Sequence, residues 1–357
     1  MKKRHYWLVL ATVLYLTLLG VLFFLPGRQN GILISPLSQN FFKQQSKPLE
    51  KYSFENLRKR EYQGSEIKLE KIIKEEEKYT SWLFSFQSDG QKVTGMANLP
   101  LRLRSGFTLK VHPEGQAKFP VVVMLRGYAD DEIYFTGLGT RKAAGVFSEN
   151  GFITLAPDFL GFGDSDTSSA DILEARFERP ITVLNLLASI TRQNSQGDLG
   201  GRVNPEKVFM WGHSNGGQIA LSVLEILAKN NLSANWRIPT TLWAPVTKGF
   251  PESVLQYMAE LDDQGLKVKK TIDDFTSIYE SKYYSIDQYW NDIQTPLQVH
   301  QGTADEYIQT EWTDNFVQTL KNLGKSVVYY KYANNDHNLS RDWDLVVSRD
   351  LKFFQSK

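Results

Sequence analysis

The chain has 357 residues, of which 41% are hydrophobic and 23% charged, and its formal net charge is +1. This length fits one large domain or two small ones, and the balanced charge gives no electrostatic reason to expect nucleic acid as a partner. The absence of cysteine excludes disulfides, a thiol nucleophile and cysteine-ligated metals.

The first thirty residues predict a membrane anchor. Residues 1–5 are basic, and Trp7–Leu25 follows as 19 residues without a charge. At about 1.5 Å per residue, this stretch nearly spans a hydrocarbon core of roughly 30 Å. Because the positive charge precedes the span, we expect the N-terminus in the cytoplasm and the rest of the chain outside. A cleaved signal peptide, and thus a secreted protein, is the alternative, although the stretch is long and no small-residue cleavage site follows it.

Residues 26–78 are expected to form a tether and a charged lead-in segment. Residues 26–50 are rich in Pro, Gly, Gln, Asn and Ser, a composition typical of linkers. Residues 51–78 carry charges of both signs with few apolar residues between them. We interpret this second part as a solvated helix or an edge element.

From residue 79 to the end, short apolar runs alternate with helix-like stretches. Strands are expected at 81–87, 92–100, 107–113, 119–125, 151–157, 207–212, 240–245, 295–300 and 326–332. Helical patterns occupy 181–190, 218–229 and the stretch after residue 340. The alternation predicts an α/β fold with a mostly parallel central sheet and helices on both faces. In such sheets, functional residues lie at the C-terminal ends of the strands.

The sequence WGHSNGG at 211–217 carries the clearest chemical signal. Ser214 stands between Gly212 and Gly216 in a G-x-S-x-G pattern, after an apolar run and before a helical run. A nucleophile elbow requires this order of strand, tight turn and helix, because the serine hydroxyl must project above the sheet. The helix N-terminus offers amide donors, so we expect the backbone N–H of Asn215 to bind an oxyanion. The N–H or hydroxyl of Tyr128, in the loop after strand 119–125, is the expected second donor.

A serine nucleophile needs a base, and the chain has five histidines. His5 lies before the apolar span, and His112 is beside a proline near an expected turn. His213 is next to the expected nucleophile, with its side chain expected to point away, and His300 lies at the end of a strand. The fifth, His337, follows the last expected strand and precedes an amphipathic helix. We therefore predict that His337 is the catalytic base.

The base in turn needs an acid to orient it. Asp305 lies in the loop after the strand that contains Val299, and the order Ser214, Asp305, His337 is that of α/β-hydrolases. Glu306 and Asp336 are alternatives. We favour Asp305, because Glu306 is expected to face solvent and Asp336 adjoins the histidine too closely to meet its ring.

Residues 79–357 resemble the catalytic domain of the prolyl oligopeptidase family, within the α/β-hydrolase superfamily. The matching stretches are SFQSDGQKVTGMANLP, FPVVVMLRGY, GFITLAPDFLGFGDSD, VNPEKVFMWGHSNGG, TPLQVHQGTADEYI and NNDHNL, in the order expected for the family. The resemblance implies Ser214, Asp305 and His337 as the triad. It also implies that the Tyr128 hydroxyl can donate to the oxyanion.

Two features depart from the family pattern. The roughly fifty residues between the apolar span and the hydrolase domain are too few for the β-propeller that many members carry. The paired glutamates of the dipeptidyl peptidases are also missing from the sequence.

The expected function is that of a serine hydrolase that cleaves a peptide bond through an acyl-enzyme. A carboxylesterase that acts on small or acylated esters is the alternative, and a non-catalytic binding protein on the same fold is a more remote one. The chemistry calls for no cofactor or metal. The expected partners are a peptide or small ester substrate and, through the N-terminal helix, a membrane.

Residues 249–292 are longer than an ordinary connection and are expected to form a lid or pocket wall. This insertion is rich in large side chains: Tyr257, Met258, Phe275, Tyr279, Tyr283, Tyr284, Tyr289 and Trp290. Our hypothesis is that several of them line an apolar pocket for an acyl group or side chain.

Overall fold

The computed structural model describes residues 47–101, 118–192, 197–199, 201–230, 232, 237–257 and 263–357. Contacts within the chain divide it into Met1–Pro48 and a compact unit, Leu49–Lys357. The expected membrane span at residues 7–25 and the expected strand at 107–113 lie outside the described residues. Among the helices of the described ranges, none is sufficiently long and apolar to cross a membrane.

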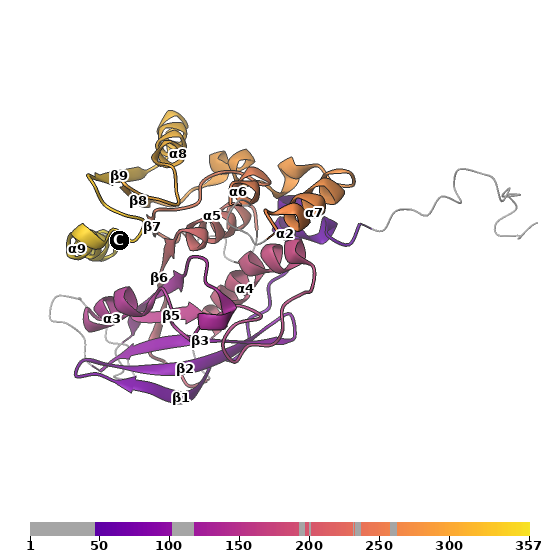
Figure 1. Cartoon of the computed structure of the whole chain (residues 1–357). Coiled ribbons are helices and arrows are strands. Elements are labelled where there is room, and N and C mark those ends of the chain that lie inside the picture. Colours follow the sequence, from indigo (N-terminus) through magenta and orange to yellow (C-terminus); the bar gives the residue numbers. More distant parts are fainter. Residues whose placement is uncertain are drawn as a thin grey trace, which may run out of the picture. The chain divides into compact units, whose positions relative to one another are not determined.

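A nine-stranded sheet forms the centre of the described part of Leu49–Lys357 (Figure 1). The strand order is β1-β2-β3-β5-β4-β6-β7-β8-β9, with antiparallel pairing from β1 to β5 and parallel pairing from β5 to β9. The strands are β1 Lys68–Glu75, β2 Tyr79–Ser88, β3 Gln91–Pro100, β4 Phe119–Leu125, β5 Ile153–Pro157, β6 Val203–His213, β7 Thr240–Trp243, β8 Leu297–Gly302 and β9 Val327–Tyr332. The mostly parallel sheet predicted from the alternating pattern is confirmed.

Helices cover both faces of this sheet. They are α2 Phe54–Lys59, α3 Arg141–Glu149, α4 Ile172–Arg192, α5 Asn215–Leu227, α6 Glu252–Leu255, α7 Leu266–Thr276, α8 Thr310–Asn322 and α9 Trp343–Gln355. Successive side chains of a strand point to opposite faces, so β4 serves two cores. Val121 and Val123 join the core beneath α4, α5 and α8, whereas Val122 and Met124 join the core beneath α3 and α9.

The segment before residue 79 is part of this unit rather than only a tether. Leu49, Tyr52, Phe54 and Leu57 are buried in the larger core, and the Leu49 amide donates to the Tyr279 hydroxyl at 3.0 Å. These residues belong to the compact unit, which begins at Leu49. The apolar residues here are few and irregularly spaced among charges, so their burial leaves no periodic pattern. The mostly exposed strand β1 lies at the edge of the sheet.

The insertion at residues 249–292 forms α6, α7 and three short 3₁₀ helices. Its aromatic residues pack around Phe177 of α4, with ring centroids at 5.5 Å for Phe250, 6.0 Å for Phe275 and 5.3 Å for Tyr284. Tyr289 and Trp290 pack on rings elsewhere in the core. Met258 lies outside the described residues.

A buried carboxylate links α9 to two central strands. Asp350 of α9 accepts hydrogen bonds from Trp243 Nε1 of β7 at 2.7 Å and from His300 Nε2 of β8 at 2.9 Å. Both Asp350 and His300 are fully buried. His300 and Asp350 thus fix the C-terminal helix against β7 and β8.

Candidate active site

Ser214 occupies a strained turn between β6 and α5. Its backbone angles, φ 55° and ψ −121°, are unfavourable for a residue with a side chain. Two hydrogen bonds fix the turn to the end of β7: the Ser214 N–H donates to the Trp243 carbonyl at 2.9 Å, and the Ser214 carbonyl accepts from the Val246 N–H at 3.0 Å. This is the elbow that the G-x-S-x-G pattern predicts.

Neighbouring backbone atoms leave no room for a side chain at the two glycines of the pattern. A Cβ atom on Gly216 would lie 2.0 Å from the carbonyl oxygen of Leu125 in the neighbouring strand β4. A Cβ atom on Gly212 would lie 2.7 Å from the carbonyl oxygen of Gly216. Real Cβ contacts are not this short, so only glycine lets the strand, the turn and the helix approach one another so closely.

Asp305 and His337 meet at the ends of neighbouring strands. Asp305 follows β8, His337 follows β9, and His337 Nδ1 lies 3.0 Å from both carboxylate oxygens of Asp305. Nδ1 therefore donates to the carboxylate, which leaves Nε2 of the neutral ring as a proton acceptor. Burial alone would raise the pKa of Asp305, but His337 and the amides of Ile308 and Tyr307 hold that pKa below its usual value. The carboxylate is therefore ionised and oriented at neutral pH.

The two alternative acids make other contacts. Glu306 accepts a hydrogen bond from the backbone N–H of His337 at 3.2 Å, and Asp336 accepts one from the Ser340 N–H at 2.8 Å. Among the described contacts, neither carboxylate bonds to the imidazole of His337. The geometry therefore favours Asp305, as the sequence did.

His213 contributes to the site in a way that we did not foresee. Its buried ring lies 4.7 Å from the His337 ring, and its Nε2 donates to the His337 carbonyl at 3.1 Å. Burial and the neighbouring His337 lower the pKa of His213 to about 4, so it is uncharged at neutral pH. Side chains alternate between the two faces of β6, and Phe209 and Trp211 pack on the face that α9 covers. His213, two residues after Trp211, is therefore expected on that same face.

Ser214 and His337 both follow the C-terminal ends of strands, β6 and β9, but across the described part of the chain no hydrogen bond joins their side chains. The His337 imidazole instead packs on His213, the residue directly before Ser214. Catalytic hydrogen bonds are often long in unliganded enzymes and shorten when substrate binds.

Two backbone amides are available beside Ser214. The loop after β4 approaches closely, because a Cβ on Gly127 would lie 3.5 Å from Ser214 Oγ. Tyr128 follows in that loop, and its side chain is 80% exposed. In the described residues, the amides of Tyr128 and Asn215 both lack a hydrogen-bond acceptor. Each can therefore donate to an oxygen bound above the serine.

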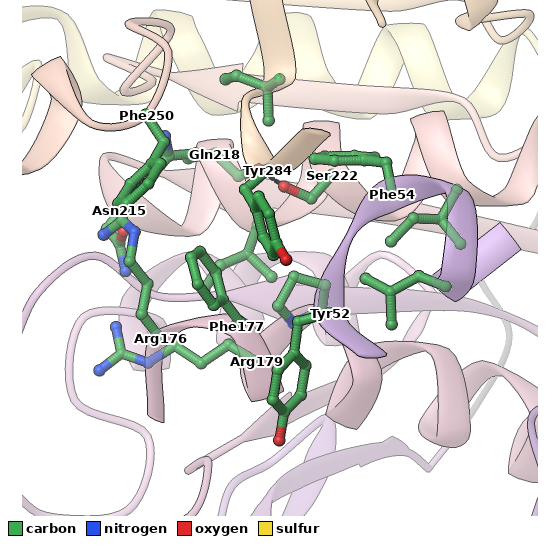
Figure 2. Close-up of a pocket in the computed structure, with 15 residues that line it drawn as sticks. Tyr52, Phe54, Arg176, Phe177, Arg179, Asn215, Gln218, Ser222, Phe250 and Tyr284 are labelled. Atoms are coloured by element: carbon green, nitrogen blue, oxygen red, sulfur yellow. Dashed lines mark hydrogen bonds between the residues drawn. The ribbon is translucent and has the colours of Figure 1, made fainter. Parts of the chain in front are cut away.

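A pocket with a cavity volume of about 50 Å³ opens beside Asn215 (Figure 2). Its walls come from four parts of the chain: Tyr52, Phe54 and Leu57; Arg176, Phe177, Arg179 and Pro180; Asn215, Gln218, Ile219, Ser222 and Ile226; and Phe250, Tyr284 and Ile286. Of the aromatic residues that we expected from the insertion, Tyr284 lines this pocket, whereas Phe275 and Tyr279 pack in the core. No group of three or more His, Asp or Glu in the described ranges could hold a metal ion.

The fold and this site define the class of the protein, which is a serine hydrolase with an α/β-hydrolase fold. Residues 194–357, which include the elbow and the Asp305 and His337 loops, match the prolyl oligopeptidase family. This match confirms the resemblance to the prolyl oligopeptidase family seen in the sequence. A comparison with curated proteins finds no match.

Solved structures show the same fold in peptidases and esterases. An acylaminoacyl peptidase of Pyrococcus horikoshii is 18% identical, with 78% of this chain and 41% of that chain covered and a TM-score of 0.53. A puromycin-hydrolyzing peptidase of Mycobacterium tuberculosis is 13% identical, with 79% and 40% covered and a TM-score of 0.53. Acetyl xylan esterase 1 of Thermoanaerobacterium is 12% identical, with 82% and 88% covered and a TM-score of 0.51. The chain thus spans about two fifths of the length of these two peptidases.

The low pKa of His213 makes stability depend on pH. Unfolded histidine titrates near pH 6.5, so between about pH 6.5 and 4 the unfolded chain binds a proton that the folded chain excludes. We expect this residue to remove about 3 kcal/mol of stability as the pH falls through that window. His213→Asn keeps a donor without a titrating ring, so it should flatten this part of the curve.

Urea unfolding of wild type and His213→Asn at several pH values between 4 and 7.5 measures this difference. Titrating groups away from His213 act on both proteins equally, so the comparison isolates His213 together with its coupling to His337. Parallel stability curves for the two proteins would contradict the low pKa of His213.

Proposed function

We propose that the chain is a serine peptidase that cleaves an amide bond through an acyl-enzyme on Ser214. The contact of the ionised Asp305 with His337, at the sheet edge that carries the strained Ser214, is the observation that supports this proposal. Ser214 Oγ attacks the substrate carbonyl while His337 Nε2 takes its proton. The same imidazole then gives the proton to the leaving amine, and Asp305 holds the ring and stabilises its charge.

A short movement completes the catalytic contact in this scheme. His337 rests on the His213 ring, and the tautomer set by Asp305 leaves Nε2 to accept a proton. In our proposal, the hydrogen bond between Ser214 and His337 forms when substrate fills the site and excludes water. His213 acts as a positioning residue, because it supports both the ring and the carbonyl of His337.

The oxyanion of the tetrahedral intermediate is bound by Asn215 and Tyr128 in this proposal. Both amides lie beside Ser214 without an acceptor in the described residues, and the exposed Tyr128 side chain can turn towards the site. Each donor of such a pair typically lowers the barrier by about 3–4 kcal/mol.

Carboxylester hydrolysis is the second candidate. Esters and amides pass through the same tetrahedral intermediate, and an ester leaving group needs less help from a proton donor. The fold likeness to an acetyl xylan esterase, of which 88% is covered, supports this candidate. The match of residues 194–357 to the prolyl oligopeptidase family supports the peptidase.

The location of the enzyme is proposed from the sequence. The uncharged stretch Trp7–Leu25 after a basic start supports a single membrane span, with a cytoplasmic N-terminus and an extracytoplasmic catalytic domain. A secreted form produced by signal cleavage is the alternative. Alkaline carbonate extraction of membranes from expressing cells should leave the full-length chain in the pellet, whereas a shorter chain in the medium would favour the secreted form.

The nucleophile is tested with a fluorophosphonate probe, which reacts with activated serines. We expect the wild-type chain to be labelled and Ser214→Ala to remain unlabelled with an unchanged circular dichroism spectrum. Well-folded wild-type protein that resists the probe would remove the basis of the proposal. A panel of p-nitrophenyl esters beside aminoacyl and prolyl anilides then separates the candidates, because the peptidase proposal requires hydrolysis of anilides.

Tyr128→Phe tests the proposed oxyanion donor. Removing a hydroxyl that donates in the transition state should lower kcat about 10²-fold and leave KM little changed. Because the side chain is exposed, the free energy of unfolding should stay within about 0.5 kcal/mol of wild type. An unchanged kcat would leave only the backbone N–H of Tyr128 as a donor from this loop.

A further inference from the structure

Two arginines of α4 line the pocket beside the elbow. Arg176 and Arg179 are one helical turn apart, and both are half-buried. Figure 2 shows their guanidinium groups on the same side of the pocket as Asn215, whose amide adjoins the nucleophile. The remaining wall is largely apolar, with Phe177, Phe250 and Ile219 among its members.

Neither arginine has an acidic partner in the described part of the chain. Arg176 donates to the Gln218 side-chain oxygen and, at 3.3 Å, to the Ser253 hydroxyl, both of which are neutral. Arg179 has no hydrogen-bond or ion-pair partner among the described residues. Other arginines of this protein do pair with acids, as Arg58 does with Asp292 at 2.8 Å. The pocket thus holds two positive charges that the described residues leave uncompensated.

The surroundings add further positive charge. Burial lowers the pKa of Arg176 to about 10, and burial with the charges of Arg126 and Arg176 lowers that of Arg179 to about 10. Both guanidinium groups are still charged at pH 7. Arg179 also interacts electrostatically with Tyr128 of the proposed oxyanion loop. Charges shielded from water are normally paired, so this arrangement is suited to an anionic ligand.

The position of the pocket shows which part of a substrate would enter it. The pocket residues come from the segment 52–57, α4, α5 and the insertion, and none comes from the loops that carry Asp305 and His337. A leaving group must depart towards His337, because the imidazole protonates it. The pocket next to Asn215, which these loops do not line, is therefore suited to the acyl part of the substrate.

We propose that Arg176 and Arg179 form an anion subsite that binds a carboxylate on the acyl part of the substrate, as in a glutamyl or aspartyl residue. A guanidinium group binds a carboxylate through two parallel hydrogen bonds, and the apolar wall covers the methylenes between the carbonyl and the carboxylate. This subsite rests on the proposed function, because acylation of Ser214 brings the acyl group here.

The test compares substrates that differ by one charge. N-acetyl-glutamate α-methyl ester and N-acetyl-glutamine methyl ester have nearly the same shape, and the matching p-nitroanilides change only the leaving group. At pH 7.5, we expect wild type to have at least a tenfold higher kcat/KM for the glutamyl substrate, equivalent to about 1.4 kcal/mol.

Single variants show whether the arginines cause the preference. Arg176→Gln and Arg179→Gln should each reduce the ratio to threefold or less, and Arg179→Lys should keep part of it by retaining the charge. Arg192→Gln is the matched control: this exposed arginine lies on the same helix, but it donates to the Gly64 carbonyl and lines no part of the pocket. It should leave the ratio unchanged.

The outcomes separate this inference from the proposed function. Hydrolysis of the esters without the anilides contradicts the peptidase proposal, while the glutamyl-to-glutaminyl ratio of the esters still tests the subsite. Equal rates for the two acyl groups in wild type, or glutamine variants that slow both substrates equally, overturn the subsite. If the fluorophosphonate labels Ser214 but the protein hydrolyses neither ester, the subsite proposal is overturned as well.

Discussion

The backbone clamp on Ser214 is the constraint on which the site depends. A serine held at φ 55° costs on the order of 1–3 kcal/mol, so the surrounding structure must impose it. Here the end of β7 does so, through the hydrogen bonds to Trp243 and Val246. Because β7 also pairs with β8, the same ladder that clamps the serine places the loop of Asp305 beside it. Ser214 and the loop of Asp305 are thus held by one set of parallel strands.

The buried Asp350 of α9 stabilises the same strands, β7 and β8. It binds Trp243 and His300 in neighbouring strands, and its helix α9 follows the loop that carries His337. His213 then fixes that loop against the elbow. His337 is therefore held by His213 and by the attachment of the following helix α9, although it belongs to a loop.

The sequence predicted the parts of the fold that have a regular pattern. The apolar runs identified β4 to β9, and the glycine spacing around Ser214 identified the elbow. The role of His213 escaped us because the contact is made in space, to a residue far along the chain. Nothing in the sequence sets Arg176 and Arg179 apart; their place in the pocket and the lack of an acidic partner among the described residues do so. The buried residues before residue 79 were missed because burial of a short irregular segment depends on its partners.

One wall of the pocket is formed by Tyr52, Phe54 and Leu57. This wall matters when a shorter fragment of the enzyme is prepared. A fragment cut at the start of β2 would keep the elbow, Asp305 and His337, yet it would lack one side of the cavity next to Asn215. Its specificity would then describe a wider opening than the one in the whole chain. The compact unit begins at Leu49, well before the start of β2 at Tyr79.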